Sequence, residues 1–204
     1  MSLEVTLQRI VQIQTLLSPA PPPPAAPVAA PSAFGQALQA AGGQPTGGAV
    51  GVLPATGGTP GGRAALAAAQ AEVGQAEQPP GSNDSPRISQ YRQATAGAGV
   101  GPWCAYFVSW AARQAGTPIG DQGQGYGRVD DVWAWGERTG RAMPAAGAVP
   151  QSGDLIVWDE HIGIVESVAP DGTITTVEGN SSDAVSRRTY AAGGGGAIGY
   201  VRLG

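Results

Sequence analysis

The chain has 204 residues, a formal net charge of −4, one cysteine and one histidine. All 11 basic residues are arginine, and they form no basic patch that could follow a phosphate backbone, which argues against a nucleic-acid-binding protein. A single cysteine excludes an internal disulfide, and no apolar stretch approaches the length of a membrane span.

Residues 1–18 predict a short amphipathic helix, because apolar side chains recur at Leu3, Leu7, Ile10 and Ile13. The segment lacks the basic start, the continuous apolar stretch and the small-residue cleavage site of a Sec signal peptide. We interpret it either as a frayed tail or as a docking or export signal. If the protein works outside the cytoplasm, it leaves by a route that needs no Sec signal peptide; a cytoplasmic location stays open.

Residues 19–62 differ in composition from the rest of the chain. Seven prolines lie between Pro19 and Pro31, nine glycines lie between Gly42 and Gly62, and the interval contains no charged residue. Such a segment cannot bury enough apolar surface to offset its conformational entropy. We therefore expect a disordered linker.

Residues 63–204 have the composition of a single folded domain. They contain all five tryptophans and all five tyrosines of the chain. Helical patterns occupy residues 63–77, 85–92 and 102–115 and the region around Val129 and Trp135, whereas β-rich runs occupy residues 154–158, 162–168, 173–177 and 200–203. Helices followed by an antiparallel sheet predict an α+β fold.

Cys104 lies in the first turn of the helix predicted over residues 102–115. Pro102 suits a helix start, and the run after it is apolar almost all round, which is typical of a buried central helix. The first turn has unpaired backbone N–H groups that favour an anion such as a thiolate. A buried cysteine that acts as a small hydrophobic residue is the alternative.

His161 opens the second predicted strand, and Glu178 and Asn180 share one face at the end of the third. If the hairpin is centred near Pro170, Asn180 lies opposite His161 and Glu178 lies opposite Gly163. The missing side chain of Gly163 would leave room for the Glu178 carboxylate to reach the imidazole. A shift of one residue would place both groups on the wrong face.

Cysteine, histidine and a polar orienting residue together make an activated thiol nucleophile. Taken singly, each of these residues has a simpler explanation, namely core packing for the histidine and turn chemistry for Glu178 and Asn180. The combination of the one cysteine at a helix start with the one histidine at a strand start favours a catalytic site.

The sequence resembles the CHAP domain, a cysteine, histidine-dependent amidohydrolase/peptidase of the papain-like fold. The resemblance is carried by PPGSNDSPRISQY, GPWCAYFVSWAARQAG, PQSGDLIVW, DEHIGIVESV and TTVEGNSSDAVSRR, in that order. It implies Cys104 as the nucleophile, His161 as the base, Glu178 as the third member and Asn180 as an additional polar group. The implied activity is cleavage of an amide bond of bacterial peptidoglycan, by an endopeptidase or an N-acetylmuramoyl-L-alanine amidase.

Some members of this family carry a calcium loop of closely spaced aspartates. Asn83-Asp84 and Asp130-Asp131 do not form such a loop, so we expect neither a metal nor another cofactor. Trp103 and Tyr126 are candidates for walls of the substrate groove, with a core position as the alternative for Trp103.

Residues 1–40 resemble the leading segment of actinobacterial flagellum-associated wall hydrolases, through IVQIQTLL and FGQAL. This resemblance implies a partner in the envelope or in flagellar export. Two other functions stay open: a wall-binding module without catalysis, and an assembly component of an envelope machine.

Overall fold

The computed structural model describes residues 57–204, which form four helices and six strands. The helices are α3 (Pro60–Gln70), α4 (Pro86–Arg92), α5 (Cys104–Gln114) and α6 (Val129–Arg138). The strands are β1 (Ala142–Pro144), β2 (Leu155–Val157), β3 (Ile162–Val168), β4 (Ile174–Glu178), β5 (Ser186–Tyr190) and β6 (Gly199–Val201). The predicted α+β class is confirmed, whereas the helix expected over residues 1–18 and the linker up to residue 56 lie outside the described residues.

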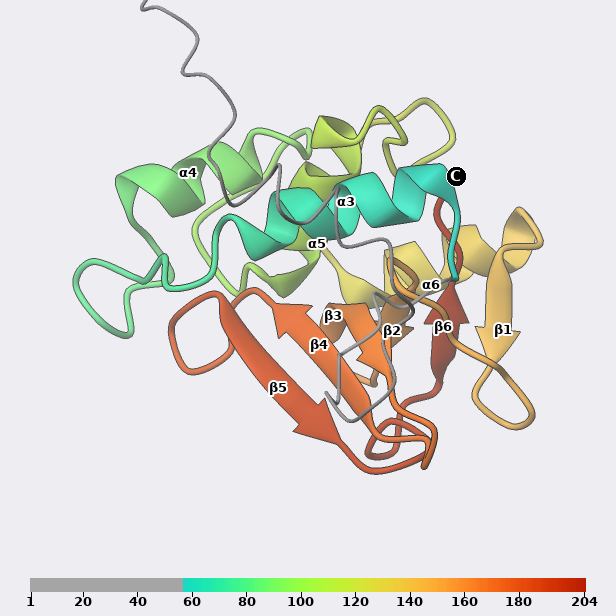
Figure 1. The fold of residues 1–204 in the computed structure, drawn as a ribbon. Coiled ribbons are helices and arrows are strands. Elements are labelled where there is room, and N and C mark those ends of the chain that lie inside the picture. The colour runs from blue at the N-terminus through green and yellow to red at the C-terminus, as the bar shows by residue number, and fades with distance from the viewer. Residues whose placement is uncertain (1–56) are drawn as a thin grey trace, which may run out of the picture. The chain divides into compact units, whose positions relative to one another are not determined.

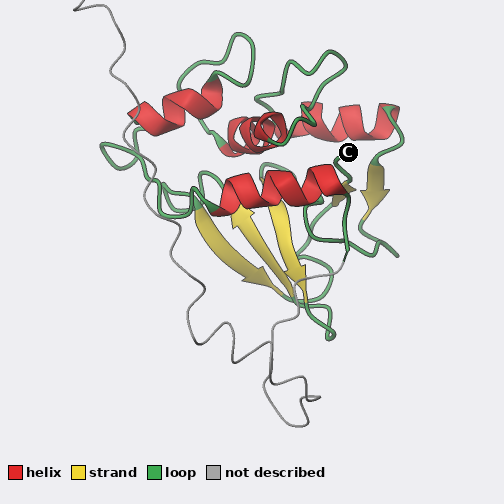
Figure 2. Ribbon diagram, turned by 45° about the horizontal axis from the view of Figure 1, so that its top comes forward, coloured by secondary structure: helices red, strands yellow, loops and turns green. Residues whose placement is uncertain are grey.

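The six strands form one antiparallel sheet in the order β1-β6-β2-β3-β4-β5. Helices α3 and α5 cross one face of this sheet as a separate layer (Figures 1 and 2). The main core lies between the two layers and includes Phe107, Val108, Ile164 and Val177. No helix in residues 57–204 is long and apolar enough to cross a lipid bilayer.

A second, smaller core covers the opposite face of the sheet. It contains Ile156, Val165, Ile174 and Tyr200, and Trp158 packs against its edge. The two faces alternate along each strand, as a period of two requires. The sheet is therefore buried on both sides near its centre.

The register of the β3–β4 hairpin is the predicted one. Ile164 pairs with Val177 and Val165 pairs with Thr176, which puts Gly163 beside Glu178. A β-bulge between Val165 and Ser167 shifts the register nearer the turn, and the sequence analysis did not foresee it. Because the bulge lies on the turn side, it leaves the end of the hairpin that carries His161 and Glu178 in place.

Helix α3 begins three residues before the boundary predicted at Arg63. Thr59 caps it by accepting a hydrogen bond from the Gly62 N–H at 2.9 Å, and Pro60 occupies its first position. A side chain at Gly62 would meet the Gly153 carbonyl oxygen at 3.0 Å. The glycines that predicted a linker here instead permit close packing of α3 against the segment before β2.

The same helix ends at Gln70, short of the predicted end at Glu77. The chain turns at Gly74, whose φ of +96° suits glycine, and its N–H donates to the Val185 carbonyl at 2.9 Å. Ala76 then forms a β-bridge with Ala184. Residues 74–77 therefore pair with the segment before β5, because backbone hydrogen bonds to residues 183–185 replace helical ones there.

The start of α3 generates the first testable prediction. The Thr59 hydroxyl accepts from Gly62 and also donates to the carbonyl of Leu203, so it joins the two ends of the domain. Thr59→Ala should lower the free energy of unfolding by about 1 kcal/mol, the usual loss for a helix cap. Urea unfolding followed by tryptophan fluorescence measures this change. Thr59→Ser keeps the hydroxyl and should retain most of the stability; equal losses in both variants would contradict the capping role.

Candidate active site

Cys104 is the first residue of α5, and its side chain is 5% exposed. The residue before it, Trp103, makes no side-chain cap, so no capping side chain occupies the first backbone N–H groups of the helix. The helix itself is fixed by burial of nearly its whole length. The sulfur is thus held at the positive end of a rigid helix, where an anion is favoured.

His161 lies immediately before β3, and its side chain is 29% exposed. Its carbonyl accepts the Trp158 N–H at 2.8 Å, which closes the short connection from β2. The ring Nε2 donates to Oε2 of Glu178 at 2.8 Å. This bond leaves Nδ1 as the ring nitrogen that can pair with the Cys104 thiol.

Two partners set the charge of His161. Burial lowers the pKa of its ring, but hydrogen bonds to Cys104 and to Glu178 outweigh burial, and the pKa rises from 6.5 to about 9. The imidazolium is therefore the main form at neutral pH. An imidazolium beside a thiol stabilises the thiolate, which is the nucleophilic form of cysteine.

Glu178 is the last residue of β4 and is only 1% exposed. Its Oε1 accepts hydrogen bonds from the hydroxyls of Thr176 at 2.6 Å and Tyr190 at 2.9 Å, while Oε2 accepts from His161. Burial raises the pKa of the carboxyl. These hydrogen bonds and the imidazolium lower it by more than burial raises it, so the net shift is downward. The buried carboxylate is thus anionic and fully partnered.

Two glycines allow this close approach. A side chain at Gly163 would lie 2.7 Å from Cγ of Glu178, so the space that the carboxylate occupies exists because residue 163 is glycine. A side chain at Gly179 would lie 2.5 Å from Cβ of Phe107. The end of β4 therefore packs directly onto α5, the helix that carries Cys104.

Trp158 lies beside the ring of His161 and also beside Tyr190. The Trp158 ring lies 5.6 Å from the imidazole and 4.9 Å from the Tyr190 ring, centroid to centroid. Its Nε1 donates to the Gly194 carbonyl at 2.8 Å, which fixes its orientation. Trp158 and Tyr190 therefore limit the access of water to the His161–Glu178 hydrogen bond.

The strand pattern places Thr176 on the face of Glu178, two residues before it, but assigns no role to Thr176, Tyr190 or Trp158. Tyr190 was not detectable, because it lies on β5, a strand that its mostly polar sequence did not predict.

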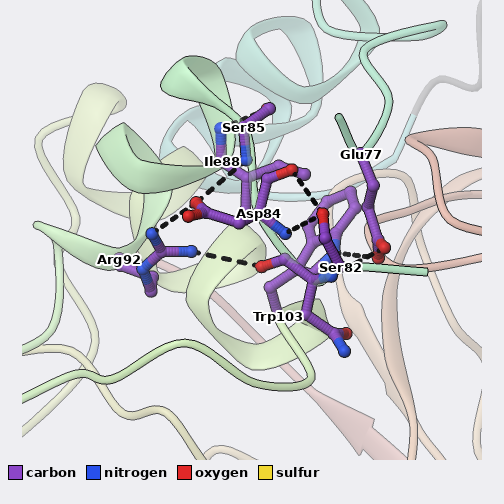
Figure 3. A network of polar contacts seen from close by, with 8 residues as sticks. Glu77, Ser82, Asp84, Ser85, Ile88, Arg92 and Trp103 are labelled. Carbon is purple, nitrogen blue, oxygen red and sulfur yellow. Dashed lines mark hydrogen bonds and ion pairs between the residues drawn. The ribbon is translucent and has the colours of Figure 1, made fainter. Parts of the chain in front are cut away.

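Trp103 belongs to the core and not to a groove wall. It is 0% exposed, and its Nε1 donates to Oε1 of Glu77 at 2.9 Å. The other oxygen of Glu77 accepts the Asn83 N–H at 2.7 Å. Figure 3 shows Glu77 and Trp103 at one end of a polar network that also includes Asp84 and Arg92. The backbone of Asn83 connects them, because it donates to Glu77 and accepts from Arg92.

Glu77 also ties the cysteine side of the site to the carboxylate side. Its side chain holds Trp103, the residue before Cys104, and its backbone N–H donates to the Asp183 carbonyl at 2.8 Å. Asp183 lies in the loop that follows Glu178. This buried glutamate, 3% exposed, was not singled out from the sequence.

Asn180 opens the loop after β4 with a φ of +57°. The hydrogen bonds of residues 57–204 include none from its side chain, so its role stays a prediction. Tyr126 is half-buried, and its backbone exchanges two hydrogen bonds with the Ser109 hydroxyl on α5, at 2.9 and 3.0 Å. Its predicted contact with substrate likewise stays a prediction.

No three metal-binding side chains among residues 57–204 lie close enough together to hold an ion. A cavity of about 370 Å³ lies between α4 and α5, lined by residues that include Arg87, Trp110 and Arg113. None of the candidate catalytic residues lines it.

The family model of the CHAP domain matches residues 95–180, a range that includes Cys104, His161, Glu178 and Asn180. This part of the chain is therefore similar to the CHAP domain, as the resemblance indicated. Such a domain implies amidase or peptidase activity of the peptidoglycan-hydrolase type. Comparisons with curated proteins and with solved structures found no significant match, and nothing in them supports the resemblance of residues 1–40 to flagellum-associated hydrolases.

The space beside Gly163 generates the second prediction. Gly163→Ala should push the Glu178 side chain away from His161 and lower the pKa of the ring, so that Cys104 loses part of its cationic partner at pH 7. Iodoacetamide should alkylate Cys104 of the native wild type at pH 7 and roughly tenfold more slowly in the variant, because a neighbouring imidazolium favours the reactive form of a cysteine.

Gly101→Ala is the matched control, because a side chain there meets nothing within 4 Å. Alkylation at the wild-type rate in Gly163→Ala would show that Glu178 does not govern the thiol. A requirement for denaturant in the wild type would show that the thiol is inaccessible.

Proposed function

We propose that this protein is a peptidoglycan hydrolase that cleaves an amide bond of the bacterial cell wall, as an endopeptidase or as an N-acetylmuramoyl-L-alanine amidase. The observation that carries the proposal is the hydrogen bond that the His161 ring donates to Glu178, within the residues matched by the CHAP family. Cys104 is the other group that raises the pKa of this ring. A cysteine at a helix start against a histidine at a strand start is also the arrangement of papain-like enzymes. We assign the domain to that fold.

The proposed first half-reaction forms a thioester. The Cys104 thiolate attacks the carbonyl carbon of the scissile amide, and the backbone N–H of Cys104 supports the oxyanion that develops. The carbon–nitrogen bond then breaks, and Nδ1 of His161 gives its proton to the leaving amine. The acyl group remains on the sulfur, and His161 is left neutral.

The second half-reaction restores the site. Neutral His161 removes a proton from water, and the resulting hydroxide attacks the thioester carbonyl. Collapse of the tetrahedral intermediate releases the carboxylic acid and regenerates the thiolate and imidazolium. Glu178 stays anionic throughout and favours the imidazolium in each resting state, while Thr176 and Tyr190 hold the carboxylate in position.

For the organisation of the chain, we propose a catalytic domain of residues 57–204, which revises the predicted start at Arg63. The proposal for residues 1–18 is unchanged, and the proposed linker now covers residues 19–56. A substrate in the wall would place the enzyme in the cell envelope or outside the cell. A pull-down with residues 1–56 alone tests whether this segment binds an envelope partner.

The third prediction tests the nucleophile. Cys104→Ala should reduce hydrolysis by at least roughly a thousandfold, and Cys104→Ser should be nearly as inactive, because neither side chain supplies a thiolate. The assay is release of soluble fragments from purified peptidoglycan, identified by mass spectrometry, which also reveals the bond that is cut. Unchanged thermal melting is the control for folding. Wall binding by the wild type without any release would favour a non-catalytic wall-binding module.

The fourth prediction separates Glu178 from Asn180. In the wild type, the alkaline limb of the pH–rate profile should lie near the pKa of His161, about 9, because activity falls when the imidazolium loses its proton. The pKa is raised by Cys104 and by Glu178, and Glu178→Gln removes the carboxylate, so the limb should move down by roughly one pH unit. Asn180→Ala should lower the rate and leave the limb in place. A limb that moves only in Asn180→Ala would reverse the two assignments.

A further inference from the structure

Arg188 lies on β5 and points to the same side of the sheet as the candidate catalytic carboxylate. It pairs with Thr176 on β4, and directly paired residues of antiparallel strands project to one face. Thr176 donates to Glu178 and therefore shares that face. Arg188 and Glu178 are diagonal neighbours, whose separation in such a ladder is about 7–8 Å.

Two hydroxyl groups hold the Arg188 guanidinium. Its Nε donates to Oγ of Ser181 at 2.8 Å, and its Nη2 donates to Oγ of Ser182 at 2.6 Å. Both serines follow Asn180 in the loop after β4. The guanidinium has five N–H groups in a fixed planar arrangement, so three remain for another acceptor.

No carboxylate in residues 57–204 forms an ion pair with Arg188. The charge of Glu178, the nearest catalytic carboxylate, is already matched by His161. The Arg188 charge nonetheless acts on this part of the site. Burial and Glu178 raise the pKa of Tyr190 to about 12, and the Arg188 charge opposes this rise. Arg188 is thus an exposed, oriented cation beside the catalytic groups without an acidic partner of its own.

The neighbouring Arg187, on the same strand, has a structural role and serves as a comparison for Arg188. Arg187 pairs with Val177, projects to the helix side of the sheet and forms an ion pair with Glu166 at 3.0 Å. Charged residues on an edge strand also prevent pairing with other sheets. That function requires only exposure, and it does not explain why hydroxyls fix the Arg188 guanidinium on the catalytic face.

We infer that Arg188 is a substrate-binding residue that receives a carboxylate of the peptide next to the scissile amide. This inference rests on the proposed function and adds to it a substrate class, namely stem peptides that carry a free carboxylate at this position. The outward N–H groups of the guanidinium match the two oxygens of a carboxylate. Replacement of that carboxylate by a neutral amide would weaken recognition.

The test compares two soluble muropeptides that differ only in their carboxyl groups, which are free in one and converted to carboxamides in the other. The full-length wild type should prefer the free acid in kcat/KM by roughly 10- to 100-fold, the range for a charge-assisted hydrogen-bonded pair. Arg188→Gln should lose this preference through a higher KM on the acid, with kcat nearly unchanged. Arg188→Lys should retain part of the preference, and Arg187→Gln should retain all of it.

Two further variants separate recognition from folding. Ser182→Ala removes one anchor of the guanidinium but keeps its charge, so most of the preference should persist. Cys104→Ala, which cannot turn over substrate, should bind the free acid more tightly than the amide in calorimetry, and the Cys104→Ala/Arg188→Gln double variant should bind both equally.

The outcomes distinguish this inference from the proposed function. Equal losses of kcat/KM on acid and amide in Arg188→Gln would mean that Arg188 only supports the loop, and would overturn the inference alone. Hydrolysis of both muropeptides by the wild type without discrimination would do the same. Absence of hydrolysis of either muropeptide and of intact walls would overturn the proposed function and this inference with it.

Discussion

The fold around the site depends on one buried electrostatic arrangement, in which the His161 ring lies between a thiol and a carboxylate that is 1% exposed. A buried carboxylate is costly unless both of its oxygens accept hydrogen bonds and an opposite charge is near. Glu178 meets both conditions through Thr176, Tyr190 and the imidazolium. The same contacts that keep Glu178 charged also keep His161 protonated, so the stability of this region and its chemical competence have a common origin.

The β3–β4 hairpin and α5 can approach each other closely because glycines occupy the points of contact. Gly163 gives the carboxylate its space within the hairpin, and Gly179 lets the end of β4 contact α5. Glu77 then ties the residue before Cys104 to the loop after Glu178. These contacts hold α5 and the end of β4 together, and the relative position of these two elements sets the distance from the Cys104 sulfur to the His161 ring.

Much of this arrangement could be predicted from the sequence, since periodicity and turn chemistry are local. They determined β3, the register of the β3–β4 hairpin and the shared face of His161 and Glu178. Periodicity and turn chemistry could not predict contacts between residues that are far apart in the sequence. Tyr190 lies on an edge strand with a polar sequence, Glu77 acts through a buried indole far along the chain, and the start of α3 looked like a linker because its glycines serve close packing. Whether Asn180 takes part in the chemistry remains a prediction.

The charge of His161 is the central claim, and the chain has only one histidine to report it. An NMR titration of the imidazole ring in the wild-type protein, labelled with ¹³C and ¹⁵N, follows this group without interference from another histidine. An imidazolium held by both partners predicts a midpoint near 9, which falls when Cys104 is replaced by alanine. A midpoint at or below the ordinary value of about 6.5 would mean that the ring is neutral at pH 7, and would contradict the imidazolium–thiolate site.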